Sequence, residues 1–253
     1  MKNVFLEKIH SGKAAIGTLM TMNSLEVAEI LSLVGFDWLF LDMEHGNLSL
    51  SSVQQICQVV GDKCPVLVRI PENNGLWIKK VLDIGVAGII IPHVNNKTEA
   101  LNIIHHAKYP PMGRRSVGVG RAHEYGMKFS EYVAQSNNNT AIIIQIEDIA
   151  GVQNINEILA VKGIDGVLIG PYDLSGSMNK LGEVTSPEVQ AEINKIKSTC
   201  KNKNIPFGIF VMSANTVHAE IASGCSFVAV GTDSAMLWGR ARQVLQTIHD
   251  TGK

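Results

Sequence analysis

Cysteine, excess charge of either sign and long apolar runs are all scarce in this chain of 253 residues. Its four cysteines form no C-x-x-C pair and no zinc-ligand spacing with histidine, which argues against a disulfide framework or a cysteine zinc site. We interpret them as small buried apolar residues in a reducing compartment. The formal net charge is −1 and no polybasic run occurs, so we expect no nucleic-acid partner and no membrane partner.

Apolar segments are too short for a membrane protein. No window approaches the roughly 18 consecutive apolar residues of a membrane span, and the first residues, MKNVFLEKIHSGK, are too polar for a signal peptide. We therefore expect a soluble, cytoplasmic protein. Only 18% of the residues are charged. That low fraction is typical of a chain that buries part of its surface between subunits, so we also expect a homo-oligomer.

Eight short apolar runs recur along the chain. They are almost continuous in apolar residues rather than alternating, which is typical of strands buried on both faces of a parallel sheet. The runs are AAIGTL (14–19), WLFLD (38–42), PVLVRI (65–70), GIIIP (88–92), IIIQIE (142–147), GVLIG (166–170), PFGIFV (206–211) and FVAVG (227–231).

Segments with helical periodicity separate these runs. Asn23 and Glu26 are spaced as a capping pair that opens a helix closed by Gly35. Ser186, followed by proline, is typical of the start of another helix. Strands that alternate with helices in this way predict an α/β fold, a single (β/α)8 TIM barrel that occupies residues 1–253 as one domain.

The longest connection between predicted strands runs from residue 92 to residue 141. Its first part, 95–109, is predicted to be a helix, and 110–126 is rich in Gly, Pro and Arg and is predicted to be a long loop. Loops of this length are usually functional or buried in an assembly.

Polar side chains gather where the predicted strands end, and in a (β/α)8 barrel that face carries the active site. They are the Asp42-Met43-Glu44-His45-Gly46 segment, Arg69, Gln145 with Glu147, and Gly170-Pro171-Tyr172-Asp173. Each has a structural alternative. Asp173 and Glu147 are suited to capping or to solvent, Asp42 and His45 to a structural hydrogen bond, and Arg69 to pairing with an acid of a neighbouring strand.

The combination suits one kind of chemistry. Glu147 and Asp173 can hold a hard divalent ion and leave coordination positions for a 2-oxo acid, which chelates the ion through its carboxylate and carbonyl. Arg69 offers fixed donors to a developing oxyanion, an effect worth about 3 kcal/mol per donor. His45, held by Asp42, is suited to move the proton of an alcohol whose neighbouring carbon–carbon bond breaks.

A lysine Schiff base is the other route to such a cleavage. None of the eight predicted strand ends carries a lysine, so this route is not supported. Three arginines of the long loop, Arg114, Arg115 and Arg121, are suited either to an anionic substrate tail or to salt bridges between subunits.

With these segments in view, the chain resembles the HpcH/HpaI aldolase family of metal-dependent (class II) pyruvate aldolases. The resemblance covers nearly the whole chain and rests on five segments in order: AEILSLVGFDWLFLDMEHG, VLVRIPENNGLWIKKVLDIGVAGIIIPHV, YPPMGRRSVG, IIIQIED and GIDGVLIGPYDLS. The family forms hexamers and packs its last helix on a neighbouring subunit, which implies a hexamer or trimer of dimers here.

The resemblance also implies residue roles. Glu147 and Asp173 match the metal ligands, and Gln145 matches a residue that lines the metal site. Arg69 matches the residue that contacts the pyruvyl oxygens, and His45 matches the base, with Asp42 as its partner. Gly170 and the amides of Tyr172 and Asp173 match the group that binds the substrate carboxylate, and Asp83 matches an acid near the subunit boundary. Three positions depart from the family: Tyr172 replaces a small residue, Ser116 follows Arg115 where glycine is usual, and His93 stands where an apolar residue is common.

We therefore expect a divalent-metal aldolase that cleaves a 4-hydroxy-2-oxo acid into pyruvate and an aldehyde, with Mg²⁺, Mn²⁺ or Co²⁺ as the cofactor. Two alternatives stay open. One is an acyl-CoA lyase of the citrate-lyase β-subunit type, motivated by the arginine-rich loop. The other is a non-catalytic paralogue that binds an oxo acid.

Overall fold

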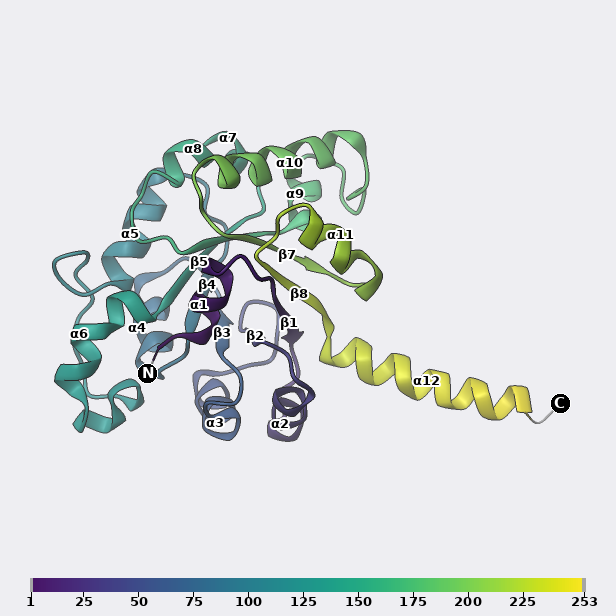
Figure 1. Cartoon of the computed structure of the whole chain (residues 1–253), viewed down its shortest axis with the longest axis horizontal. Coiled ribbons are helices and arrows are strands. Elements are labelled where there is room, and N and C mark those ends of the chain that lie inside the picture. Colours follow the sequence, from purple (N-terminus) through teal and green to yellow (C-terminus); the bar gives the residue numbers. More distant parts are fainter. Residues whose placement is uncertain (1, 252–253) are drawn as a thin grey trace.

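In the computed structural model, which describes residues 2–251, eight parallel strands close into one barrel (Figure 1). Each strand pairs with the next in sequence, and the eighth pairs with the first. The predicted (β/α)8 barrel is confirmed, and each predicted strand overlaps an observed one. The strands are β1 (Ala15–Met20), β2 (Trp38–Asp42), β3 (Val66–Arg69), β4 (Gly88–Ile91), β5 (Ala141–Ile146), β6 (Gly166–Ile169), β7 (Phe207–Val211) and β8 (Phe227–Thr232).

Helices surround the barrel and connect its strands (Figure 1). They are α1 (Val4–His10), α2 (Leu25–Val34), α3 (Leu50–Val60), α4 (Gly75–Asp83), α5 (Lys97–Ala107), the 3-10 helix η1 (Arg121–Gly126), α6 (Phe129–Asn139), α7 (Ile149–Gln153), α8 (Ile155–Ile158), α9 (Pro171–Ser177), α10 (Pro187–Asn202), the 3-10 helix η2 (Ala214–Thr216), α11 (Val217–Ala222) and α12 (Asp233–Thr251).

The strands separate two apolar cores. Phe40, Leu67 and Ile143 belong to the cluster inside the barrel, whereas Leu41 and Val68 belong to the larger cluster between the strands and the helices. Both cores are needed because successive strand side chains point to opposite faces. This explains why the apolar runs are continuous rather than alternating.

Helix α1 closes the amino end of the barrel, and Figure 1 shows it over the barrel centre. The Phe5 ring is buried there, with its centroid 5.3 Å from that of Trp38 and 5.6 Å from that of Phe227. These rings belong to the inner cluster. The first helix therefore completes the core that the strands enclose.

Two sequence-based helix predictions differ from the structure. Ser24, rather than Asn23, caps α2: its hydroxyl accepts a hydrogen bond from the Val27 amide and donates one to Glu26. Helix α6 was not predicted, and Ser136 is its single buried residue. A helix that buries so little lacks the apolar stripe by which helices are found in a sequence.

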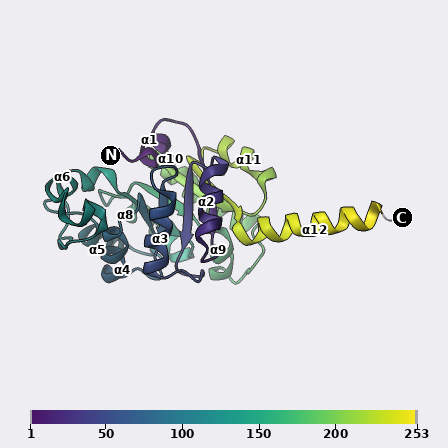
Figure 2. The same ribbon diagram turned by 90° about the horizontal axis from the view of Figure 1, so that it is seen from below.

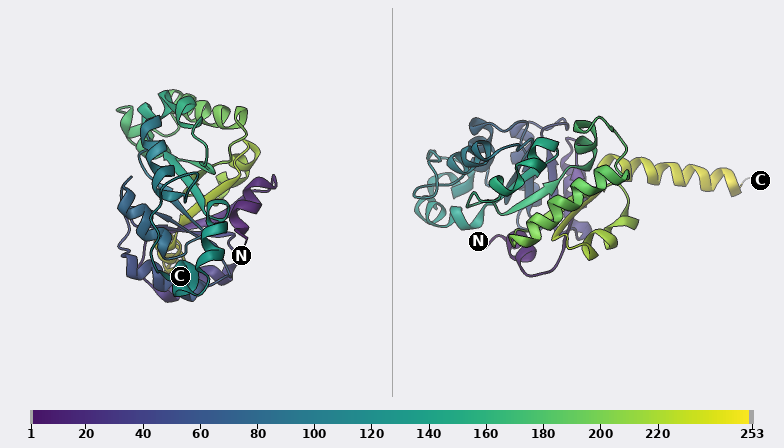
Figure 3. Two further views of the ribbon diagram at one scale, coloured as in Figure 1. Left: turned by 90° about the vertical axis from the view of Figure 1, so that its left-hand side faces the viewer. Right: turned by 90° about the horizontal axis from the view of Figure 1, so that it is seen from above.

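Helix α12 leaves the barrel after β8 and extends away from it (Figures 2 and 3). Along it Leu237, Trp238, Val244, Leu245 and Ile248 are exposed. Among the helices of residues 2–251, none has both the length and the apolar character that a membrane crossing requires.

Candidate active site

The period of two along the strands aims a set of polar side chains into the barrel. Asp42, Arg69 and Gln145 each follow an inward-facing apolar residue by two positions, and Asp42 and Arg69 are direct partners in the β2–β3 register. All three are buried. They form a polar layer at the carboxyl ends of the strands, above the inner core.

Asp42 and Arg69 form the most ordered pair of this layer. Arg69 Nε donates to Asp42 Oδ1 at 2.9 Å and Nη2 donates to Oδ2 at 2.8 Å. The guanidinium also lies over the Phe40 ring, 5.5 Å from its centroid. Burial raises the pKa of Asp42, but the hydrogen bonds and charge of Arg69, with two backbone amides, outweigh it and hold that pKa below its ordinary value.

This pairing corrects the predicted partnership of Asp42 with the His45 ring. The Asp42 carboxylate binds the Arg69 guanidinium and accepts the backbone amides of Glu44 and His45. The His45 side chain is 68% exposed, and its Nε2 lies 3.9 Å from Glu44 Oε2. Arg69 thus pairs with an acid of the neighbouring strand, as one of the two alternatives for this residue predicted.

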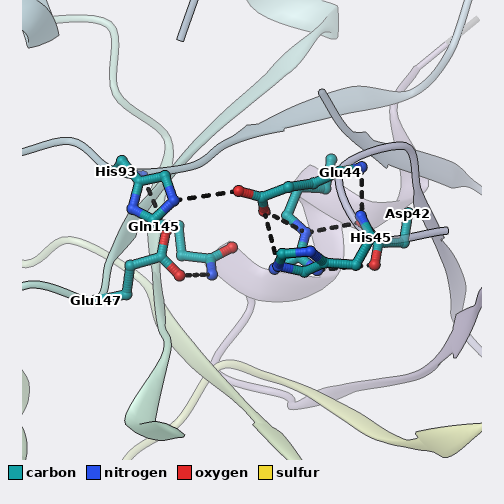
Figure 4. Close-up of polar contacts among 7 residues, drawn as sticks. Asp42, Glu44, His45, His93, Gln145 and Glu147 are labelled. Atoms are coloured by element: carbon teal, nitrogen blue, oxygen red, sulfur yellow. Dashed lines mark hydrogen bonds and ion pairs between the residues drawn. The ribbon is translucent and has the colours of Figure 1, made fainter. Parts of the chain in front are cut away.

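Glu44 was given no role in the sequence analysis, yet it lies at the centre of the cluster. Its side chain is 9% exposed, Oε2 lies 3.1 Å from Arg69 Nε, and Oε1 lies 3.2 Å from His93 Nε2. Figure 4 shows it between the His93 and His45 rings. The signal that could have identified it is its place next to His45, directly after an inward-facing strand end.

Glu147 continues the inward series of β5 by two residues beyond Gln145. Its side chain is 1% exposed. Oε1 accepts a hydrogen bond from the His93 amide at 2.9 Å, and Oε2 accepts one from Gln145 Nε2 (Figure 4). Burial raises the pKa of Glu147, and the charges of Glu44 and Asp173 add to this, against the opposing contribution of His93. A buried acid with a raised pKa beside other acids is a typical functional group.

Gly170 brings the end of β6 against Glu147. A Cβ at Gly170 would lie 2.7 Å from Glu147 Cβ and 3.0 Å from its Oε2, so only glycine allows this approach. Asp173 lies in the first turn of α9 and is exposed. Its charge makes the smallest of the contributions to the raised pKa of Glu147, whose main cause is burial.

Tyr172, which the sequence analysis placed beside the substrate carboxylate, is 59% exposed. Its hydroxyl would lie 3.6 Å from a Cβ at Gly182, so the ring extends along the loop between α9 and α10.

A family model described as HpcH/HpaI aldolase/citrate lyase matches residues 16–238 of this chain. The chain belongs to this family. The family resemblance predicted from the sequence is therefore confirmed, and the chain is a carbon–carbon lyase of the HpcH/HpaI aldolase/citrate lyase family.

Named aldolases are similar in sequence over nearly the whole chain. The 5-keto-4-deoxy-D-glucarate aldolase of Shigella dysenteriae is 36% identical over 99% of this chain and 97% of that protein. The hydroxypyruvate/pyruvate aldolase of Roseobacter denitrificans is 35% identical over 96% of this chain and 95% of that protein. A crystal structure of a family protein from Burkholderia cenocepacia superposes with a TM-score of 0.94 at 26% identity, covering 98% of this chain and 100% of that one.

One residue assigned from the family resemblance lies elsewhere. Asp83 ends α4, and because the helices run back along the barrel, this end lies near the amino ends of the strands. There Asp83 accepts a hydrogen bond from Arg115 Nη2 at 2.7 Å. Within one HpcH/HpaI chain, Asp83 is therefore not part of the cluster around Glu147.

Two of the three loop arginines are occupied within the chain. Arg115 is buried against Tyr109 and Tyr132 and pairs with Asp83. Arg121 donates to the carbonyls of Ile84 and Cys57. Within the chain, both guanidinium groups hold the long loop on its own barrel.

The donor set fits a hard divalent ion with few protein ligands. Buried Gln145 Oε1 receives no hydrogen bond, Glu44 Oε2 has the Arg69 guanidinium beside it, and the cluster gathers carboxylate oxygens without cysteine. Within residues 2–251, no group of three or more His, Cys, Asp or Glu side chains is arranged to hold a metal. A divalent cation needs few protein carboxylates when substrate and water supply its other ligands, and Glu147 is a buried carboxylate at this place.

Proposed function

We propose that this HpcH/HpaI enzyme is a divalent-metal aldolase that cleaves a 4-hydroxy-2-oxo acid to pyruvate and an aldehyde and catalyses the reverse addition. The observation that carries the proposal is a group of buried carboxylates at the ends of β2 and β5: Glu147 Oε1 and Glu44 Oε1 lie 3.3 Å and 3.2 Å from the two ring nitrogens of His93. An array of acids gathered this closely is stabilised by a cation. A fixed arginine lies in the same layer, ready for an oxyanion.

Glu147 and Asp173 would hold the ion, with Gln145 lining the site. Oxygen ligands of this kind suit Mg²⁺, Mn²⁺ or Co²⁺. The bound ion supplies an electron sink for the negative charge that develops on the 2-oxo acid when the carbon–carbon bond breaks.

Arg69 is the group best placed to stabilise that charge. Asp42 holds its guanidinium in a bidentate pair, so its orientation is set before substrate arrives. Removing one such preorganised donor typically lowers kcat by about 10² to 10³. Asp42 therefore acts in our proposal by orienting Arg69, and not by orienting His45.

His45 is the proposed base. Its exposed ring stands at the rim of the polar layer, where it can take the proton of the substrate hydroxyl directly or through water. Gly170 and the backbone amides at Tyr172 and Asp173, at the start of α9, would bind the substrate carboxylate, because the amino end of a helix favours an anion.

The relatives suggest the substrate class. The two relatives are named as aldolases of 5-keto-4-deoxy-D-glucarate and of hydroxypyruvate or pyruvate, and each of these compounds contains a 2-oxo acid group. We extend this class to the present enzyme.

We further propose a homohexamer, or trimer of dimers, in which α12 packs on a neighbouring subunit. The exposed apolar residues of α12 support this, since a helix that projects from its own barrel has no core to cover them (Figure 2). In such an assembly Asp83 would serve the site of a neighbouring subunit.

The decisive experiment measures pyruvate release from 4-hydroxy-2-oxo acids in metal-free protein and after Mg²⁺, Mn²⁺ or Co²⁺ is restored. We expect no turnover without metal and recovery with it. Turnover with chelator present, together with trapping by borohydride, would support a Schiff base. Binding of CoA in calorimetry would support the acyl-CoA lyase, and binding of metal and oxalate without turnover would support a non-catalytic protein.

A further inference from the structure

His93 follows β4 and contacts two carboxylates that come from different strands. Its backbone amide donates to Glu147 Oε1 at 2.9 Å, its Nδ1 lies 3.3 Å from the same oxygen, and its Nε2 lies 3.2 Å from Glu44 Oε1. Figure 4 shows the ring between the two acids. One imidazole thus connects the ends of β2 and β5.

The backbone at His93 is unusual. Its φ is 54°, in the left-handed region, which costs an L-residue other than glycine about 1 kcal/mol or more. Such a conformation persists where its surroundings hold it, and here the amide and both ring nitrogens have acidic neighbours. The side chain is 59% exposed, so core packing does not account for the conformation.

We propose that His93 is a positioning residue that fixes the Glu147 carboxylate for the divalent ion and connects it to Glu44. This inference rests on the proposed function. Gln145 holds Oε2 of Glu147, and the amide and ring of His93 hold Oε1, so the directions of both oxygens are set and their remaining lone pairs would be available to an ion. Partners that orient a ligand in this way typically change metal affinity by about 10- to 100-fold.

The connection to Glu44 makes the inference specific. Glu44 Oε2 lies beside Arg69 and its Oε1 beside His93, so the ring joins the metal ligand to the group that neighbours the proposed oxyanion donor. If the His93 ring transmits the influence of Glu44 to Glu147, replacing Glu44 should lower the metal affinity only while His93 is present.

The test measures Mn²⁺ affinity of the metal-free protein by calorimetry for the wild type, His93→Asn, Glu44→Gln and the double variant. Asparagine tolerates the left-handed conformation and keeps the backbone amide, but its side chain is too short to span both acids. We expect His93→Asn to weaken Mn²⁺ binding about 10-fold. Glu44→Gln should weaken it in the wild type and leave it unchanged in His93→Asn. His105→Ala, which removes an exposed histidine of α5, is the matched control and should bind like the wild type.

Three results would overturn the inference while leaving the proposed function intact: unchanged Mn²⁺ affinity in His93→Asn, additive effects of the two substitutions, or a pulsed-EPR nitrogen signal from an imidazole bound directly to Mn²⁺ that disappears in His93→Asn. The last would make His93 a ligand. A wild-type protein that binds no Mn²⁺ would instead remove the proposed function and this inference together.

Discussion

The Asp42–Arg69 pair shows how single residues set the geometry of this site. The two side chains come from facing positions of adjacent strands and form two hydrogen bonds below 3.0 Å. Neither group is solvated, so each depends on the other for its charge to be compensated.

Asp42→Asn should therefore destabilise the protein by about 3 kcal/mol at pH 7, since it leaves a buried guanidinium short of its partner. The folded pKa of Asp42 lies below its unfolded value of about 3.9. The contribution of the Asp42 carboxylate to folding stability is therefore complete above that value and is lost as the pH falls through the folded pKa. Urea unfolding at several pH values should show that the difference in the free energy of unfolding between Asp42→Asn and the wild type becomes smaller below about pH 4. The exposed Asp62→Asn is the control, and an Asp42→Asn protein as stable as wild type at pH 7 would contradict the prediction.

Residue types in the sequence indicated which groups are candidates for the site, but not which of them are in contact. Asp42, Arg69, Gln145 and Glu147 were found because polar residues end apolar strands. The partner of Asp42 was predicted wrongly, because a strand register decides it and the sequence does not show the register.

At the scale of elements, α1 has a larger structural role than its seven residues suggest. It supplies Phe5 to an aromatic cluster inside the barrel, where a shell of strands alone would leave the amino end open. This helix was not predicted, because a helix so short has no repeated apolar stripe.

Phe5→Ala should lower the free energy of unfolding by about 3 to 5 kcal/mol, through lost burial and the cavity that remains. Val4→Ala, at a neighbouring position that is 60% exposed, should change it by less than about 0.5 kcal/mol. Denaturant unfolding of both variants measures the difference. Equal stability of the two would mean that α1 is not part of the cooperative core.

On the scale of the whole molecule, α12 is the feature that a single chain does not explain. It extends away from the barrel (Figure 3), and several of its large apolar side chains are exposed. The low charge of the sequence predicted a homo-oligomer, and α12 is the surface we expect it to use.

Leu245→Asp should weaken assembly while leaving the barrel folded, because Leu245 is 58% exposed in the single chain and a charge there would be costly only against a neighbour. Light scattering coupled to size exclusion should show smaller particles than wild type. Gln246→Asp, an exposed polar position on the same helix, should keep the wild-type mass. Identical masses for all three proteins would exclude this part of α12 from the interface.

The barrel and most of the candidate residues could be predicted from the amino-acid sequence, because strand-length apolar runs and the polar groups that end them are local patterns. Only the tertiary structure decided the contacts: that Asp42 binds Arg69, that Glu44 and His93 connect to Glu147, and that Asp83 lies away from them. The reason is physical. Such contacts depend on strand register, on the left-handed backbone at His93 and on where each helix ends, and these are set by packing between segments that are distant in the chain.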